Sequence, residues 1–201
     1  MGYYVRLLSP ADKRVPFSEL KDQVENLKLI SGTEAEWEEI LVPGPSEIPI
    51  AHLLRIARVT DTGSQIIEKL KDGIAGRYPE KAKEWIKHYL ESVKTIYAFQ
   101  LLTENLTTDA EWRTLGHVQN HLKDSLGGII QSDNEGYYNE NGDYILWQMY
   151  PGAGGSVPAA VLDENNVWKP FQLKLDDPKA VEAFQSGDMP RKTLFDIFFR
   201  R

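Results

Sequence analysis

The chain has 201 residues, a formal net charge of −7 and 41% hydrophobic residues, a composition ordinary for a globular protein. It contains no cysteine, which excludes disulfides, thiolate metal sites and cysteine nucleophiles. A pI near 5.2 argues against general nucleic-acid binding. No apolar run is long enough for a membrane span, and the N-terminal residues lack the layout of a signal peptide. We therefore expect a cytoplasmic protein.

The N-terminal part predicts a strand, a helix and a second strand. β-favouring residues indicate a strand over 3–8. Ser18 is a candidate N-cap for a helix that runs to about Lys28, because apolar residues then recur at helical spacing. Residues 37–42 have the composition of the second strand. This order predicts a strand-helix-strand unit.

Residues 48–75 allow two interpretations at their start. Pro49 weakens a central strand, so residues 48–59 fit either a strand or a short helix. A break follows at 60–63, and Ser64 is placed to cap a further helix.

Two long helices are predicted in the middle of the chain. Pro79 suits the first position of one helix, and apolar residues at three- and four-residue intervals extend it to about Thr103. Thr108 and Glu111 have the spacing of a capping box, which opens a second helix to Leu126. The predicted apolar stripe of the second helix consists of Trp112, Leu115, Val118, Leu122 and Leu126.

The C-terminal part predicts antiparallel hairpins. A strand begins at 129, and a hairpin over 137–149 turns at Asn141-Gly142, a strong turn signal. A second hairpin pairs 159–162 with 167–175, and Pro178 opens a short final helix.

The order of these elements predicts an α+β fold, with an N-terminal strand-helix-strand unit, a helical middle and C-terminal antiparallel hairpins. We expect one domain over 1–201, with 60–63 or 151–156 as alternative boundaries. The tail over 194–201 is too apolar to be left in solvent. It is interpreted as a final strand or as a patch that docks on a partner or second subunit, which would suit a scaffold role.

The segment 124–168 is unusual in charge and in aromatic content. It has no lysine or arginine before Lys169, and its acidic residues equal in number the whole formal net charge. These acids are Asp124, Asp133, Glu135, Glu140, Asp143, Asp163 and Glu164. The aromatic residues of the segment are Tyr137, Tyr138, Tyr144, Trp147, Tyr150 and Trp168. Such a segment suits a cationic partner or a polar ligand that stacks on rings.

We therefore expect a non-enzymatic protein-binding module that uses this segment against a basic partner, for example as an immunity-like inhibitor. Aromatic residues are good interface anchors, and clustered carboxylates speed the encounter with a basic protein. The candidate partner-binding residues are Asp133, Glu135, Tyr137, Glu140, Asp143, Tyr144 and Trp147.

The alternative is a metal-dependent hydrolase on the capped helix. His117, His121 and Asp124 fall on one polar face of that helix and could ligate a divalent metal such as zinc. The motif lacks the glutamate of the zinc-protease pattern, and Arg113 on the same face would repel a cation. A solvated helix face explains these residues more simply.

Two other ligand-binding patterns fail on spacing. Asp133 to Asp143 resembles a calcium loop in composition, but neither glycine places oxygen ligands at the required positions. The glycine-rich run 152–156 lacks the lysine and helix start of a phosphate loop. Turn chemistry accounts for both runs.

Overall fold

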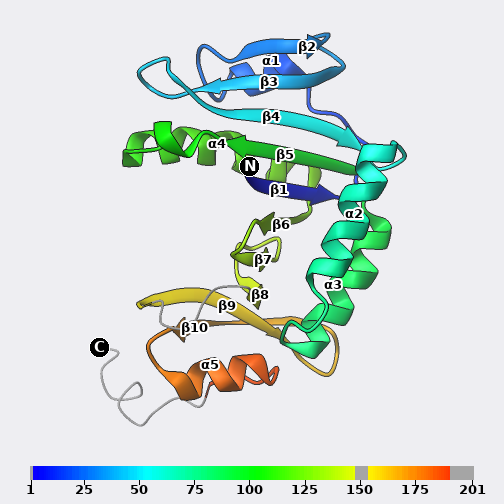
Figure 1. Ribbon diagram of the computed structural model, residues 1–201, viewed down its shortest axis with the longest axis vertical. Helices are drawn as coiled ribbons and strands as arrows, with labels where there is room; N and C mark the ends of the chain where they lie inside the picture. The colour runs from blue at the N-terminus through cyan, green and yellow to red at the C-terminus, as the bar shows by residue number, and fades with distance from the viewer. Residues whose placement is uncertain (1, 148–153, 191–201) are drawn as a thin grey trace.

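The strands of the protein join into one mixed sheet, which runs from β2 at one end of the molecule to β10 at the other (Figure 1). The computed structural model describes residues 2–147 and 154–190. The sheet has ten strands in the order β10-β9-β8-β7-β6-β1-β5-β4-β3-β2. Neighbouring strands are antiparallel except β8 and β9, which are parallel and meet at Tyr144 and Ala159.

The bounds of the elements follow the chain. The strands are β1 (Tyr3–Ser9), β2 (Lys28–Gly32), β3 (Trp37–Pro43), β4 (Pro49–Ala57), β5 (Thr95–Leu101), β6 (Ile129–Ser132), β7 (Gly136–Tyr138), β8 (Tyr144–Trp147), β9 (Ser156–Leu162) and β10 (Trp168–Lys174). The helices are α1 (Phe17–Lys21), α2 (Asp61–Gly73), α3 (Glu80–Ser92), the short 3-10 helix η1 (Thr103–Asn105), α4 (Asp109–Leu126) and α5 (Pro178–Gln185). The mixture confirms the α+β class.

Helices cover both faces of the sheet. On one face, α1 and α4 pack against β1, β3, β4 and β5 around buried side chains such as Leu20, Tyr97 and Leu115. On the other face, α2 and α3 bury Ile67 and Ile86 against the same sheet. A smaller cluster lies between β9, β10 and α5. The two larger cores exist because strand side chains alternate between the faces of a sheet.

The predicted helix over 79–103 is wrong in its second half. The helix ends at Ser92, and residues 95–101 form β5, which lies between β1 and β4. All but one of the β5 residues are buried, because helices cover both faces. A strand buried on both faces is apolar throughout, so its periodicity does not separate it from a helix.

The N-terminal prediction is also corrected in part. The helix expected from Ser18 to about Lys28 is the short α1, and Lys28 instead begins the edge strand β2. The ambiguous segment 48–59 is a strand, β4, so Pro49 marks its first residue. The N-cap of α2 is Thr60 rather than Ser64, because the Thr60 side chain accepts a hydrogen bond from the Gly63 amide.

The local signals in the second half of the chain are confirmed. The capping box of Thr108 and Glu111 opens α4, and Gly127 ends it with a φ of +64°. The hairpin of β7 and β8 turns through Gly142, and the hairpin of β9 and β10 turns through Asn166. The tail over 194–201 and residues 151–153 of the glycine-rich run lie outside the described residues. None of the helices in the ranges 2–147 and 154–190 is long and apolar enough to cross a bilayer.

Candidate functional site

A cavity of about 460 Å³ lies between β1, β6, α4 and the hairpin of β7 and β8. Its size falls in the range of small-ligand sites. The apolar part of its lining includes Val5, Leu101, Leu115 and Ile130. The aromatic and acidic part consists of Tyr3, Trp112, Tyr138 and Glu135. We refer to this cavity as the β1–α4 pocket.

The pairing of the strands explains why these side chains meet. Val5 pairs with Ser132, and Ile130 pairs with Tyr138, so their side chains leave the same face of the sheet. The α4 helix lies across this face and presents Trp112, which is 49% exposed. Trp112 was predicted in the apolar stripe of α4, but unlike the other residues of that stripe it is not buried in the core, and it lines the pocket.

A chain of hydroxyl groups surrounds the Glu135 carboxylate. The Tyr138 hydroxyl donates a hydrogen bond to Glu135 Oε2 at 2.9 Å and also contacts the Tyr144 hydroxyl. The single hydroxyl hydrogen of Tyr138 serves one acceptor at a time, so Tyr144 can donate to Tyr138 when Tyr138 donates to Glu135. Tyr3 is hydrogen-bonded to the same carboxylate. Two phenols therefore hold Glu135 in place inside the pocket.

The pKa values of these phenols respond to the same arrangement. Burial raises the pKa of Tyr3 well above its usual value, and the hydrogen bond to Glu135 raises it further. The pKa of Tyr138 is raised by burial first, then by Tyr144 and by the negative charge of Glu135. Both phenols therefore stay protonated, and remain hydrogen-bond donors, throughout the neutral range.

The chain crosses to the other face of the sheet between Asp133 and Glu135. In a continuous strand, two residues separated by one would share a face. Asn134 has a φ of +61°, which reverses the chain in the tight turn from β6 to β7. Asp133 therefore lies on the face opposite to Glu135, where it meets Arg6.

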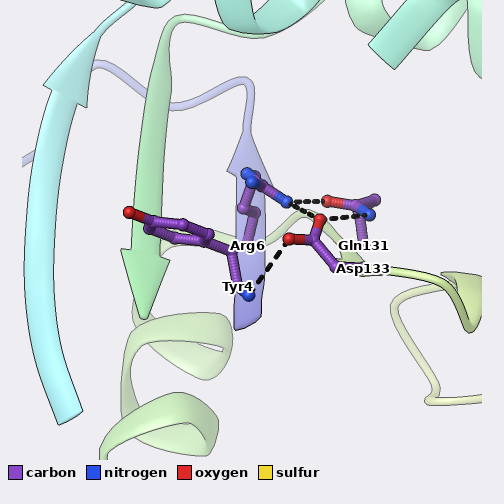
Figure 2. Close-up of polar contacts among 4 residues, drawn as sticks. All are labelled: Tyr4, Arg6, Gln131 and Asp133. Carbon is purple, nitrogen blue, oxygen red and sulfur yellow. Dashed lines mark hydrogen bonds and ion pairs between the residues drawn. The ribbon is translucent and has the colours of Figure 1, made fainter. Parts of the chain in front are cut away.

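Asp133 is held by several groups at once (Figure 2). Its carboxylate forms an ion pair with Arg6 and accepts a hydrogen bond from the Tyr4 amide at 3.1 Å. Arg6 also bonds to Gln131 and lies over the Tyr4 ring, 4.9 Å from its centroid. The Arg6 and Asp133 side chains are 14% and 29% exposed. Asp133 is thus neutralised within the protein and fastens β6 to β1.

Glu135 differs in having no positive partner. Among the described residues, no lysine, arginine or histidine forms an ion pair with it. It is partly buried and hydrogen-bonded only to uncharged phenols. The β1–α4 pocket therefore carries one negative charge that the described part of the chain does not compensate.

The other predicted partner-binding residues do not join Glu135 in the lining of the pocket, and Tyr144 only contacts the Tyr138 hydroxyl from outside that lining. Tyr137 is buried on the opposite face, and Asp143 is buried in the turn, where Asn139 donates to it at 3.1 Å. Glu140 is exposed on that turn and helps burial to raise the pKa of Tyr89 to about 12. Trp147 packs against the cluster of β9, β10 and α5. The predicted acidic residues therefore do not form one continuous surface.

The predicted metal ligands are distributed along α4. His117 and Asp124 are exposed, while His121 is partly buried with its Nε2 atom 3.9 Å from Glu19 Oε2. Within residues 2–147 and 154–190, no group of three or more histidine, aspartate or glutamate side chains is arranged to hold a metal ion. The hydrolase alternative stays a prediction without structural support.

Tyr3, Trp112 and Tyr138 line the pocket but were not among the predicted site residues. The sequence alone does not relate them, because they lie on three separate elements. His52 pairs through Nδ1 with Glu39 at 2.7 Å across β4 and β3. Only the register of the strands brings such residues together.

Comparison with known proteins gives no further assignment. The chain matches no protein-family model, no curated protein and no solved structure.

Proposed function

We propose that the protein is a non-enzymatic binding module whose β1–α4 pocket receives a cationic side chain of a basic partner protein. The observation that carries the proposal is the uncompensated Glu135 carboxylate, held by Tyr3 and Tyr138 inside an aromatic cavity. Removing a carboxylate from water is costly unless a positive charge pairs with it. A bound cation would supply the missing partner.

The charge of the surrounding segment supports the same partner. No lysine or arginine occurs from Asp124 to Trp168, so no basic side chain of this segment competes for the pocket. The exposed Glu140 and Asp124 add negative charge that would attract a basic protein before it docks. The pocket then gives the encounter a specific anchor.

The acidic residues have different roles in this proposal, because only some of them have partners within the protein. Asp133 and Asp143 have internal partners, so their replacement would disturb the fold before it disturbed binding. Glu135 and Glu140 lack such ion pairs among the described residues and belong to the same hairpin region. Only Glu135 lines the pocket. Comparing Glu135 with Glu140 therefore separates binding in the pocket from general attraction between charges.

The test compares Glu135→Gln with Glu140→Gln in the full chain. Both variants lose one negative charge, so binding of lysine- and arginine-containing peptides is measured by calorimetry at several salt concentrations. We expect Glu135→Gln to weaken binding about tenfold, or about 1.4 kcal/mol, and Glu140→Gln to change it less than about twofold. Equal losses in the two variants would show that the pocket is no anchor. Absence of binding to every cationic peptide would end the proposal.

A further inference from the structure

Aromatic rings reach the β1–α4 pocket from three elements of the fold. Tyr3 belongs to β1, Tyr138 to β7 and Trp112 to α4. The face of an aromatic ring attracts a cation, and a planar guanidinium also stacks flat on the ring, which a compact ammonium group does not. Rings from several elements around one cavity therefore favour a flat cation.

The α4 wall of the pocket also carries a hydrogen-bonding group. Trp112, Leu115 and Gln119 are three and four residues apart in sequence, so they lie on one face of the helix. Gln119 is partly buried, and its side chain forms no hydrogen bond with any other described residue. Its amide group offers an acceptor oxygen and two N–H donors. Gln119 thus places an available acceptor in the lining, on a different element from Glu135.

The other acceptors of the lining also lie on separate elements. Glu135 follows β6, and its carboxylate has about four acceptor positions, of which Tyr3 and Tyr138 use two. Thr103 belongs to η1, and its hydroxyl has no hydrogen bond within the described part of the chain. Ser132 of β6 is hydrogen-bonded to Tyr3 and keeps a further lone pair. The available acceptors are therefore spread over several walls of the pocket.

The two basic side chains differ in how their donors are arranged. A lysine ammonium holds three N–H donors on one nitrogen atom, whereas an arginine guanidinium holds five in a planar fork. The fork can bond a carboxylate through two parallel N–H groups and direct its other donors to acceptors elsewhere in the lining. The guanidinium is also more weakly hydrated, so less free energy is lost when Val5, Leu101 and Leu115 replace water around it. Both differences favour arginine in this pocket.

We propose that the β1–α4 pocket selects an arginine side chain of the partner over a lysine side chain, and that Gln119 determines this preference. The inference rests on the proposed function, because it names which cationic side chain the pocket receives. Glu135 pairs with the guanidinium, Gln119 accepts a hydrogen bond from one of its remaining donors, and Trp112 stacks on its face. The cavity of about 460 Å³ holds the guanidinium together with part of its aliphatic stem.

The experiment uses the full chain and three matched peptides. Each peptide has the sequence Gly-Gly-X-Gly-Gly with blocked ends, where X is arginine, lysine or citrulline. Citrulline has nearly the shape of arginine but no charge, because a urea group replaces the guanidinium. Calorimetry gives the affinities, and the indole N–H signal of Trp112 in an NMR spectrum reports entry into the pocket. We expect the arginine peptide to bind at least about fivefold more tightly than the lysine peptide and about tenfold more tightly than the citrulline peptide.

Two variants test whether Gln119 determines the preference. Gln119→Leu keeps a similar size and helix propensity but removes the acceptor, so it should lower the preference for arginine over lysine at least about threefold. Asn120→Leu makes the same amide-to-leucine change at the next position of α4, which is exposed and does not line the pocket, so the preference should stay unchanged. Urea unfolding checks that both variants are folded. An unchanged preference in Gln119→Leu, or equal losses in the two variants, would overturn the role of Gln119.

The outcomes separate this inference from the proposed function. Equal or tighter binding of the lysine peptide, with loss in Glu135→Gln, would overturn arginine selectivity and support a cation site. Equal binding of the citrulline peptide would overturn both, because charge would play no part. Free arginine is a further probe, and tighter binding of free arginine than of the blocked peptide would overturn the assignment to a partner side chain.

Discussion

Asp133 and Glu135 stand two residues apart in sequence, yet they lie on opposite faces of the sheet in opposite electrostatic states. Asp133 pairs with Arg6 and accepts a hydrogen bond from the Tyr4 amide, so its charge is neutralised where it joins β6 to β1. Glu135 receives only phenol hydrogen bonds and has no ion pair among the described residues. A local excess of acidic residues therefore does not by itself define a binding surface.

The two acids differ in whether their charge remains available to a partner. A carboxylate with an internal cation contributes to the fold, and its field outside the protein is weakened. A carboxylate without an internal cation keeps its full negative charge at the cavity that it lines. Of the predicted partner-binding acids, Glu135 combines a charge without an ion pair with a place in the lining of the pocket, and Glu140 keeps its charge in solvent.

The largest effect is expected when the ion pair between Arg6 and Asp133 is broken. Arg6→Met leaves the partly buried Asp133 carboxylate without its cation, which should lower the free energy of unfolding by about 3 kcal/mol. Urea unfolding measures the change. Adding Asp133→Asn removes the unpaired charge and should restore part of the loss. A loss no larger than that of a surface substitution would show that the ion pair does not fasten β6 to β1.

A smaller effect on the free energy of unfolding is expected at Asn134, which lies in the turn between the two acids. Asn134 has a φ of +61°, a conformation that asparagine and glycine adopt more easily than alanine. Asn134→Ala should therefore cost about 1 kcal/mol in the free energy of unfolding, whereas Asn134→Gly should cost less. The two variants are compared by thermal and urea unfolding. An alanine variant as stable as the glycine variant would contradict the proposed role of this turn.

The smallest expected effect is a change in the pKa values of the tyrosines near the two acids. Burial and Glu135 raise the pKa of Tyr3 and Tyr138, while burial raises that of Tyr137 on the Asp133 face. Glu135→Gln should lower the pKa of Tyr3 and Tyr138 and leave Tyr137 unchanged. Ultraviolet absorbance titration with single tyrosine-to-phenylalanine variants assigns each transition. Equal shifts on both faces would contradict the separation of the two acids.

The sign of the accompanying stability change follows from the same shifts. A phenol whose pKa is higher in the folded protein than in the unfolded chain stabilises the fold fully below the unfolded value of about 10. That contribution is lost as the pH rises through the folded pKa, which for Tyr89 is about 12. The contribution of these tyrosines to the free energy of unfolding should therefore stay constant up to about pH 10 and decline above that pH.

Features that depend on short-range contacts could be predicted from the sequence. The capping box of α4 joins Thr108 to Glu111 three residues away, and the hairpin turns form among neighbouring asparagine, aspartate and glycine residues. The strand at the N-terminus, the α+β class and the acidic segment were likewise readable from composition and spacing. Such features depend on hydrogen bonds and conformational preferences within a few residues, so they need no knowledge of the rest of the chain.

β5, the Arg6–Asp133 pair and the pocket depend instead on contacts between distant parts of the chain. The apolar run 95–101 fits a helix or a strand, and only its place between β1 and β4 makes it a strand. Arg6 and Asp133 are separated by 127 residues, and the pocket combines Tyr3, Trp112 and Glu135 from distant parts of the chain. Charge and burial depend on which side chains face each other across the sheet, and that is set by strand order and register rather than by local sequence.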